Sequence, residues 1–203
     1  MNKNWLKQLA CDVEAKHGKE KRDLIFGNID DLQDNPKFLS AWFENLTTEM
    51  DNLDDKEFLQ KMMAERSPCR GDDAGNGKII KDLHEKSGSL AEFVDNFRDY
   101  FTKKFGEIDK LELRGDVLYM IKPLGGSTDT GSSGKGCHCW LAKHANRAVS
   151  DIFCHCCTIG HTGGMFVAAF GDDVRLEHVE SIISGGKECT MAVHLPKTKS
   201  PGI

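Results

Sequence analysis

Cysteine and histidine gather in one stretch of this chain, and their spacing indicates metal chemistry. Cys137-His-Cys139 is followed, after fourteen intervening residues, by Cys154-His-Cys156-Cys157. If both segments are neighbouring strands, residues i and i+2 face the same side, and four sulfurs can converge. Four thiolates are the ligands of many structural zinc sites and of iron–sulfur centres. We therefore expect a metal site formed by Cys137, Cys139, Cys154 and Cys156, with zinc favoured over an iron–sulfur centre.

Two other interpretations of this stretch stay open, because one intervening residue is fewer than zinc-binding cysteine pairs usually have. Cys154-His-Cys-Cys157 is also a Cys-x-x-Cys motif just before an expected helix, whose N-terminus favours a thiolate. A redox or nucleophilic thiol is therefore the second interpretation, with Cys156 or Cys157 as nucleophile and His155 or His161 as base. Among these, Cys157 and His161 are the leading catalytic candidates. The third interpretation is that the cysteines are small, reduced and buried packing residues.

Composition restricts the classes of function. The chain has 203 residues, 27 basic and 32 acidic side chains and a formal net charge of −5. Without a basic stripe, we expect no nucleic-acid partner. No apolar run reaches signal-peptide or membrane-span length, so we expect no membrane partner and a cytoplasmic location. In a reducing compartment, clustered cysteines bind metal or do redox chemistry more often than they form disulfides.

The first half of the chain must supply a helical framework. Apolar residues recur there at helical spacing, and Asn35-Pro36, Asp54 or Asp55, and the Ser89-x-x-Glu92 capping box mark helix starts. Ser67-Pro68 ends a helix, because proline disfavours helical geometry in the residue before it. The expected helices run over Trp5–Lys16, from Asn35 to Met50, from Asp55 to before Ser67, over Lys78–Lys86, and from Ser89 to Phe105.

The second half changes to a strand pattern that would carry the cysteines. Residues 111–121 alternate well enough for two strands turning at Arg114-Gly115-Asp116. Further strands are expected over Cys137–Lys143, Ser150–Cys156, Val174–Ile183 and Cys189–Leu195, with a helix over Thr158–Phe170. The fold class is therefore α+β: a helical N-terminal half, then a mostly antiparallel sheet with one packed helix. The expected regions are 1–106, 107–195 and a tail at 196–203, together forming one compact domain or two.

Three consecutive segments near the C-terminus carry a family resemblance: Cys157–Gly171, Val174–Glu180 and Gly185–Val193. A cysteine precedes a glycine-containing helix, a strand ends in glutamate, and a turn leads into a strand beginning with cysteine. This pattern resembles the end of a 4-vinyl reductase domain and is similar to L-2-amino-thiazoline-4-carboxylic acid hydrolase-like proteins. It covers about the last 40 to 60 of the 203 residues. Ser67-Pro-Cys-Arg70 also fits a group of Cys-rich bacterial and archaeal relatives.

The resemblance implies an α+β domain that holds a small molecule and, in some members, zinc. The implied zinc ligands are Cys157 (or Cys156), Glu180 and Cys189, which we take as alternates to the four cysteines above. The family's cysteine three residues after the glutamate falls on Ile183, and the following turn is shorter. Replacement ligands would then come from Cys137 and Cys139.

We therefore expect a zinc-binding, small-molecule-binding protein of the 4-vinyl-reductase-like type, compatible with a homodimer. The alternatives are a metal- or cysteine-dependent hydrolase of a small heterocycle and a thiol redox protein. The sequence leaves open whether the protein is an enzyme.

Overall fold

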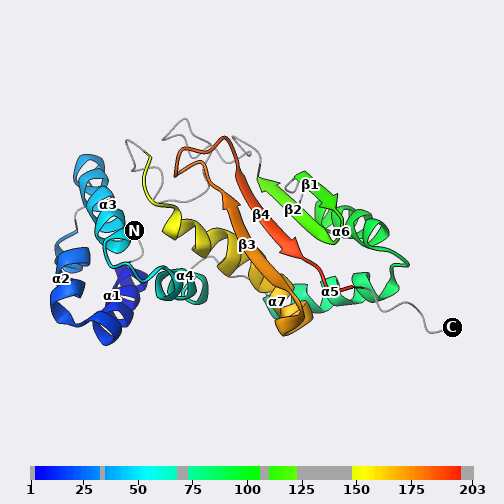
Figure 1. Cartoon of the computed structure of the whole chain (residues 1–203), viewed down its shortest axis with the longest axis horizontal. Helices are drawn as coiled ribbons and strands as arrows, with labels where there is room; N and C mark the ends of the chain where they lie inside the picture. Colours follow the sequence, from blue (N-terminus) through cyan, green and yellow to red (C-terminus); the bar gives the residue numbers. More distant parts are fainter. Residues whose placement is uncertain (1–2, 33–34, 68–72, 106–109, 123–147, 198–203) are drawn as a thin grey trace.

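A computed structural model describes residues 3–32, 35–67, 73–105, 110–122 and 148–197. Within them, helices fill the first half and a four-stranded antiparallel sheet with a packed helix forms the second, so the expected α+β class is confirmed. The helices α1–α4 gather at one end and the sheet lies at the other (Figure 1). The first-half helices are α1 (Lys3–His17), α2 (Lys19–Phe26), α3 (Pro36–Asp51), α4 (Lys56–Glu65), α5 (Asp73–Lys86) and α6 (Leu90–Phe105), with a 3₁₀ turn, η1 (Ile29–Asp31).

Side-chain caps begin several of these helices where the sequence predicts them. Asn35 accepts hydrogen bonds from the amides of Lys37 and Phe38, and Asp55 accepts one from Phe58. Ser89 accepts from the amide of Glu92, whose own carboxylate accepts from the amide of Gly88. These bonds satisfy amides that have no partner within the helix. Helix α2 was missed, because the chain turns at Gly18, with φ +87°, and resumes a helix at once.

The sheet has the strand order β1-β2-β4-β3, with all pairs antiparallel. β1 (Lys110–Arg114) and β2 (Val117–Lys122) form the predicted hairpin, in which Gly115 takes a φ of +67°. β3 (Arg175–Glu180) is shorter than predicted, because the chain turns after Glu180. β4 (Cys189–His194) lies where predicted.

One prediction fails in the segment that bears three cysteines. Ser150–Cys156 is not a strand; a continuous helical segment runs from Asp151 to Asp173. It comprises η3 (Asp151–Phe153), a π-helical stretch η4 (Cys156–Thr162), α7 (Gly163–Phe170) and η5 (Gly171–Asp173). The Ser150 hydroxyl accepts from the amide of Ile152 and so caps the start. The segment is apolar enough to be misread as a strand over a short window.

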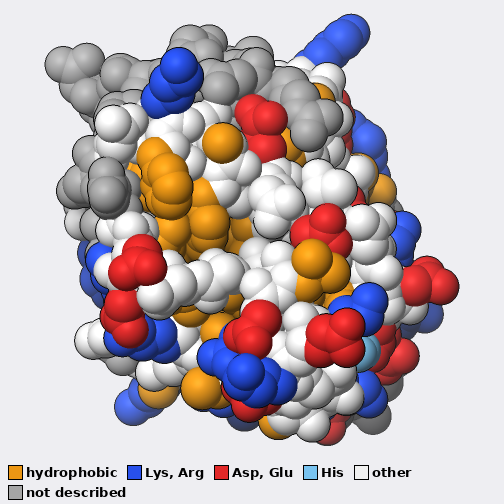
Figure 2. All heavy atoms as spheres, turned by 90° about the vertical axis from the view of Figure 1, so that its left-hand side faces the viewer, with side chains coloured by type: hydrophobic (Ala, Val, Ile, Leu, Met, Phe, Trp, Pro, Cys, Tyr) orange, Lys and Arg blue, Asp and Glu red, His pale blue; other side chains and the backbone are white. Residues whose placement is uncertain are grey.

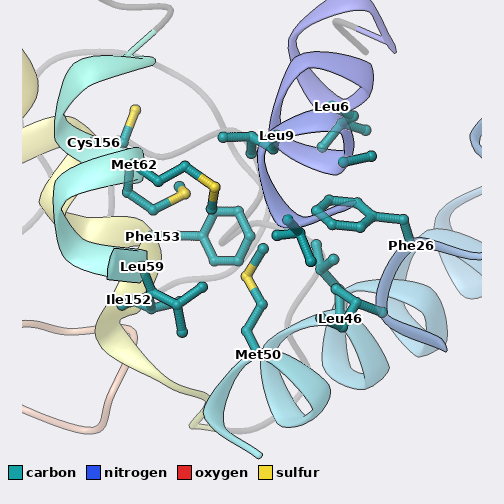
Figure 3. Packing of buried hydrophobic residues seen from close by; sticks show 14 of the residues in the cluster. Leu6, Leu9, Phe26, Leu46, Met50, Leu59, Met62, Ile152, Phe153 and Cys156 are labelled. Carbon is teal, nitrogen blue, oxygen red and sulfur yellow. The ribbon is translucent and has the colours of Figure 1, made fainter. Parts of the chain in front are cut away.

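The helical segment Asp151–Asp173 joins two hydrophobic clusters. Its start contributes Phe153 to a cluster with α1–α4 (Figure 3), and its end contributes Phe166 to a cluster with α5, α6 and the sheet. By length and composition, this segment could cross a membrane, but most of it is buried inside the protein, as in the core helix of a soluble protein.

The end of the molecule formed by α1–α3 presents hydrophobic side chains between charged ones (Figure 2). Leu24 of α2 and Phe38 of α3 are among the exposed large hydrophobic residues.

Candidate functional site

Four of the clustered cysteines lie within the described residues. Cys154, Cys156 and Cys157 are on the helical segment, and Cys189 begins β4. Cys137 and Cys139, with the strand predicted for them, lie outside the described residues. Cys69 also lies outside them, and Cys11 is exposed on α1. The structure therefore describes two members of the expected four-cysteine set.

Cys154 and Cys156 do not share one side of a strand. Residues two apart on a helix point in different directions, so their sulfurs diverge. Both side chains are buried in the hydrophobic cluster with α1–α4, where Cys156 lies beside Met62 (Figure 3). The Cys156 thiol contacts the Ser67 hydroxyl at 3.4 Å. An apolar environment disfavours the thiolate that a metal needs.

Cys157 has a different environment. The Lys122 ammonium donates a hydrogen bond to its sulfur at 3.2 Å, and the Cys157 side chain is only half-buried. A nearby ammonium stabilises a negative charge on sulfur, and the thiolate is the form that binds metals and attacks electrophiles. Among the described contacts of the three cysteines on the helical segment, the contact with an ammonium group is that of Cys157.

Cys189 lies next to Lys122 across the sheet. The two residues are register partners on β4 and β2, and directly opposed side chains lie close together on one face. Side chains alternate along a strand, so both share the helix-covered face with Met120 and Met191. The amide of Ile182 donates to the Cys189 sulfur at 3.5 Å. Lys122 thus links the Cys157 sulfur to the strand position of Cys189.

Among the described residues, no group of three or more His, Cys, Asp or Glu side chains is placed to hold a metal. The environments of Cys157 and Cys189 resemble those of zinc-binding thiolates in one respect. Both side chains are half-buried, and each sulfur has an N–H donor beside it. Such donors suit ligating thiolates. The described sulfurs therefore fit part of a zinc shell, which needs further ligands from elsewhere in the chain.

Glu180 serves the turn between β3 and β4. Its carboxylate accepts a hydrogen bond from the Lys187 amide at 2.6 Å. A side chain at Gly186 would meet this carboxylate at 2.6 Å, so glycine allows the close approach. Glu180 therefore stabilises the turn between β3 and β4, whether or not it also binds a metal. His161, the second catalytic candidate, lies half-buried in η4, one turn after Cys157.

A histidine cluster that the sequence did not reveal lies on the other side of η4. His178 of β3 is on the helix-covered face, with its side chain 3% exposed. Its Nε2 lies 3.5 Å from Asp151 Oδ2, its Nδ1 lies 3.4 Å from Thr158 Oγ1, and its ring centre is 5.3 Å from that of His155. The only sequence signal was the alternation along β3, which cannot identify what lies opposite.

His178 affects the ionisation of its two neighbours, His155 and Asp151. Burial lowers the pKa of His155 to about 4; the charge of His178 adds to this effect, and the Asp151 carboxylate opposes it. Contact with His178 lowers the pKa of Asp151, against the effect of burial. His155 is therefore a neutral imidazole near pH 7.

A cleft of about 530 Å³ opens beside this cluster, between α4, η4 and β3. Its volume falls within the range of small-molecule sites in proteins. Its lining mixes polar and apolar groups: Glu57, Gln60, Lys61, Ala64, Glu65, His155, Ile159, Leu176, Glu177 and His178.

Comparison of the chain with known protein families and with curated proteins finds no match.

Proposed function

We propose that this chain is a cytoplasmic zinc-binding protein of the 4-vinyl-reductase-like type that also binds a small molecule. The observation that carries the proposal is the hydrogen bond from the Lys122 ammonium to the Cys157 sulfur, beside Cys189 on the sheet. This hydrogen bond places a positively charged group beside one of the clustered cysteines, where it can stabilise a metal-binding thiolate. The sequence resemblance, which includes both of these cysteines, supports the same assignment.

The zinc ligands in this proposal are Cys157 and Cys189, completed by Cys137 and Cys139. The last two enter by sequence alone. Cys154 and Cys156 are less suited, because their thiols lie in an apolar cluster that disfavours the thiolate. Four thiolates leave no open position on zinc, so the metal would be structural and would fasten β4 to the helix.

The test is metal content, measured by plasma mass spectrometry on chain purified without chelator, together with titration of free thiols. We expect about one zinc per chain, as for a structural site. Cys157→Ser and Cys189→Ser should each lose most of it, whereas Cys154→Ser, Cys156→Ser and Cys11→Ser should retain it. Absence of metal from the wild-type chain would contradict the proposal. Retention by both ligand variants, with loss in Cys154→Ser, would contradict this ligand set.

A second candidate function rests on the same ammonium–sulfur contact. If Cys157 binds no metal, its sulfur beside the Lys122 ammonium is a nucleophile, as in a cysteine-dependent hydrolase, or one partner of a Cys154–Cys157 redox pair. This candidate predicts a metal-free chain in which Cys157 is alkylated faster than the exposed Cys11. Equal alkylation rates in a metal-free chain would exclude it.

A further inference from the structure

The cleft between α4, η4 and β3 is built separately from the cysteine site. None of the proposed zinc ligands lines it. Its apolar walls include Ile159 of η4 and Leu176 of β3, and its polar groups come from α4, from Glu177 of β3 and from the two histidines. A concave site with apolar walls and a few converging polar groups is the usual form of a small-molecule site.

His178, at the base of this cleft, has an oxygen atom near each ring nitrogen. The Thr158 hydroxyl donates its single proton to the Cys154 carbonyl at 2.8 Å. Towards His178 Nδ1 the hydroxyl oxygen can therefore act only as an acceptor. The other nitrogen, Nε2, faces the Asp151 carboxylate. The contacts with Thr158 and Asp151 fix the position of the ring at the base of the cleft.

The charged side chains that line the cleft are mostly acidic. Glu57, Glu65 and Glu177 contribute carboxylates, and Lys61 contributes one ammonium. Lys61 pairs with Glu65 at 3.8 Å, and Glu177 lies 3.8 Å from Arg175 and 3.3 Å from His194. Among the described residues, Glu57 has no such pair. The cleft thus offers a carboxylate that belongs to none of the described ion pairs, next to apolar walls and imidazole rings.

We propose that this cleft binds a small molecule carrying a primary ammonium group on an apolar body. Glu57 faces the ammonium group, Ile159 and Leu176 contact the apolar part, and the His155 and His178 rings form the base of the site. An anionic ligand would meet three carboxylates there and is disfavoured. The inference rests on the small-molecule part of the proposed function and does not require zinc.

The test uses n-butylammonium as the probe and the ring resonances of His155 and His178 in ¹⁵N-histidine-labelled protein as the readout. His155→Gln and His178→Gln spectra assign the resonances. We expect saturable shifts of both rings in the millimolar range, because so small a probe has few atoms with which to gain affinity. n-Butyrate, of similar size and opposite charge, should shift neither ring.

Charge-changing variants of α4 sharpen the test. Glu57→Gln should weaken n-butylammonium binding about fivefold, as expected for one partly screened ion pair. Lys61→Gln removes the competing ammonium and should strengthen binding. Glu20→Gln, at an exposed position of α2, is the matched control and should leave affinity unchanged. All three positions are exposed, and an unchanged amide spectrum verifies the fold.

Three outcomes would overturn the proposal: no saturable ring shift, equal shifts from n-butyrate, or wild-type affinity in Glu57→Gln. Failure of the zinc proposal has a separate signature, because the purified chain would contain no metal while n-butylammonium still shifted the rings. The two proposals can therefore fail independently.

Discussion

Cys157 and Lys122 come from distant parts of the chain, and their contact places a positive charge beside the sulfur. Cys156, the next residue, is buried beside a hydroxyl in an apolar cluster, whereas Cys157 receives an ammonium hydrogen bond. Neighbouring cysteines of one motif thus have opposite environments, because adjacent residues on a helix point in different directions.

Lys122→Gln should slow the alkylation of Cys157 by iodoacetamide about tenfold in chelator-treated protein. The variant removes a charge-assisted hydrogen bond that stabilises the thiolate. Peptide mapping by mass spectrometry separates Cys157 from the other cysteines. Lys103→Gln, at an exposed position of α6, is the control and should leave the rate unchanged. A Lys122→Gln rate equal to that of the wild type would show that the ammonium does not influence this sulfur.

His84 should make the protein less stable in mild acid. Its ring is buried between Phe93 and Phe170, and burial lowers its pKa from the usual 6.5. The unfolded chain therefore binds the proton first, and the free energy of unfolding decreases as pH falls below about 6.5. His84→Gln should reduce this slope between about pH 7 and pH 5 in urea titrations.

The matched control for the His84 experiment is Phe170→Leu. It alters the same ring contact without removing a titratable group, so it should lower stability at every pH and keep the wild-type slope. If His84→Gln kept the wild-type slope as well, the pH dependence would have to come from other groups.

Among the elements, the π-helical stretch η4 lies between α4 and the sheet, and two glycines, one in η4 and one at the start of α7, allow the close approach. A Cβ at Gly160 would lie 2.5 Å from the carbonyl oxygen of Ala64, and a Cβ at Gly163 would lie 2.5 Å from the Leu176 side chain. The close approach brings η4 against α4 on one side and β3 on the other, which is the arrangement that forms the cleft.

Gly160→Ala should lower the free energy of unfolding by about 3 kcal/mol, because the new methyl group meets backbone atoms of α4 that cannot move aside freely. Urea unfolding followed by circular dichroism measures the change. Gly88→Ala is the control, since its Cβ would meet only the end of the flexible Glu92 side chain, at 3.3 Å. Equal stabilities of the two variants would mean that α4 and η4 are not in tight contact.

The sequence predicts the elements best where a local signal marks their ends. Asn35, Asp55 and Ser89 cap helices as expected, because a cap depends only on neighbouring residues. The segment Ser150–Cys156 was misassigned, because its apolar residues fit a buried strand and a buried helix equally well over so few positions. Its helical form depends on packing against α1–α4. A sequence pattern over a few residues carries no information about such distant packing partners.

The candidate site was predictable only in part for the same reason. Motif and resemblance drew attention to Cys157 and Cys189, but Lys122 lies 35 residues from Cys157 and has no motif of its own. The contacts of His178 with Asp151 and Thr158 likewise require the position of β3 against the helix. Zinc binding itself stays a prediction.

In the whole molecule, the helical segment Asp151–Asp173 ties together two hydrophobic clusters. Phe153 is 1% exposed in the cluster with α1–α4, and Phe166 is fully buried in the cluster with the sheet. A substitution that weakens either cluster therefore removes packing contacts from the same helical segment (Figure 1).

Phe153→Ala should destabilise the whole protein by about 4 kcal/mol, because it leaves a cavity in a packed core. If the shared helix couples the clusters, hydrogen exchange measured by mass spectrometry should show α1–α4 and β2–β4 opening with the same free energy. Val167→Ala, at an exposed position of α7, is the control and should change stability little. Faster exchange confined to α1–α4 would show that the clusters unfold separately.

The π-helical stretch also has a consequence for how this chain can change in length. Each hydrogen-bonded ring of a π-helix contains one more residue than a ring of an α-helix. A one-residue deletion within Cys156–Thr162 can therefore be absorbed by a return to α-helical bonding, whereas the same deletion in α7 must rotate everything beyond it. The deletion would preserve the helix and yet move Cys157 relative to His161 and the two glycines. Proteins of this fold that lack one residue here would thus keep the framework and lose the present alignment of cysteine, histidine and cleft.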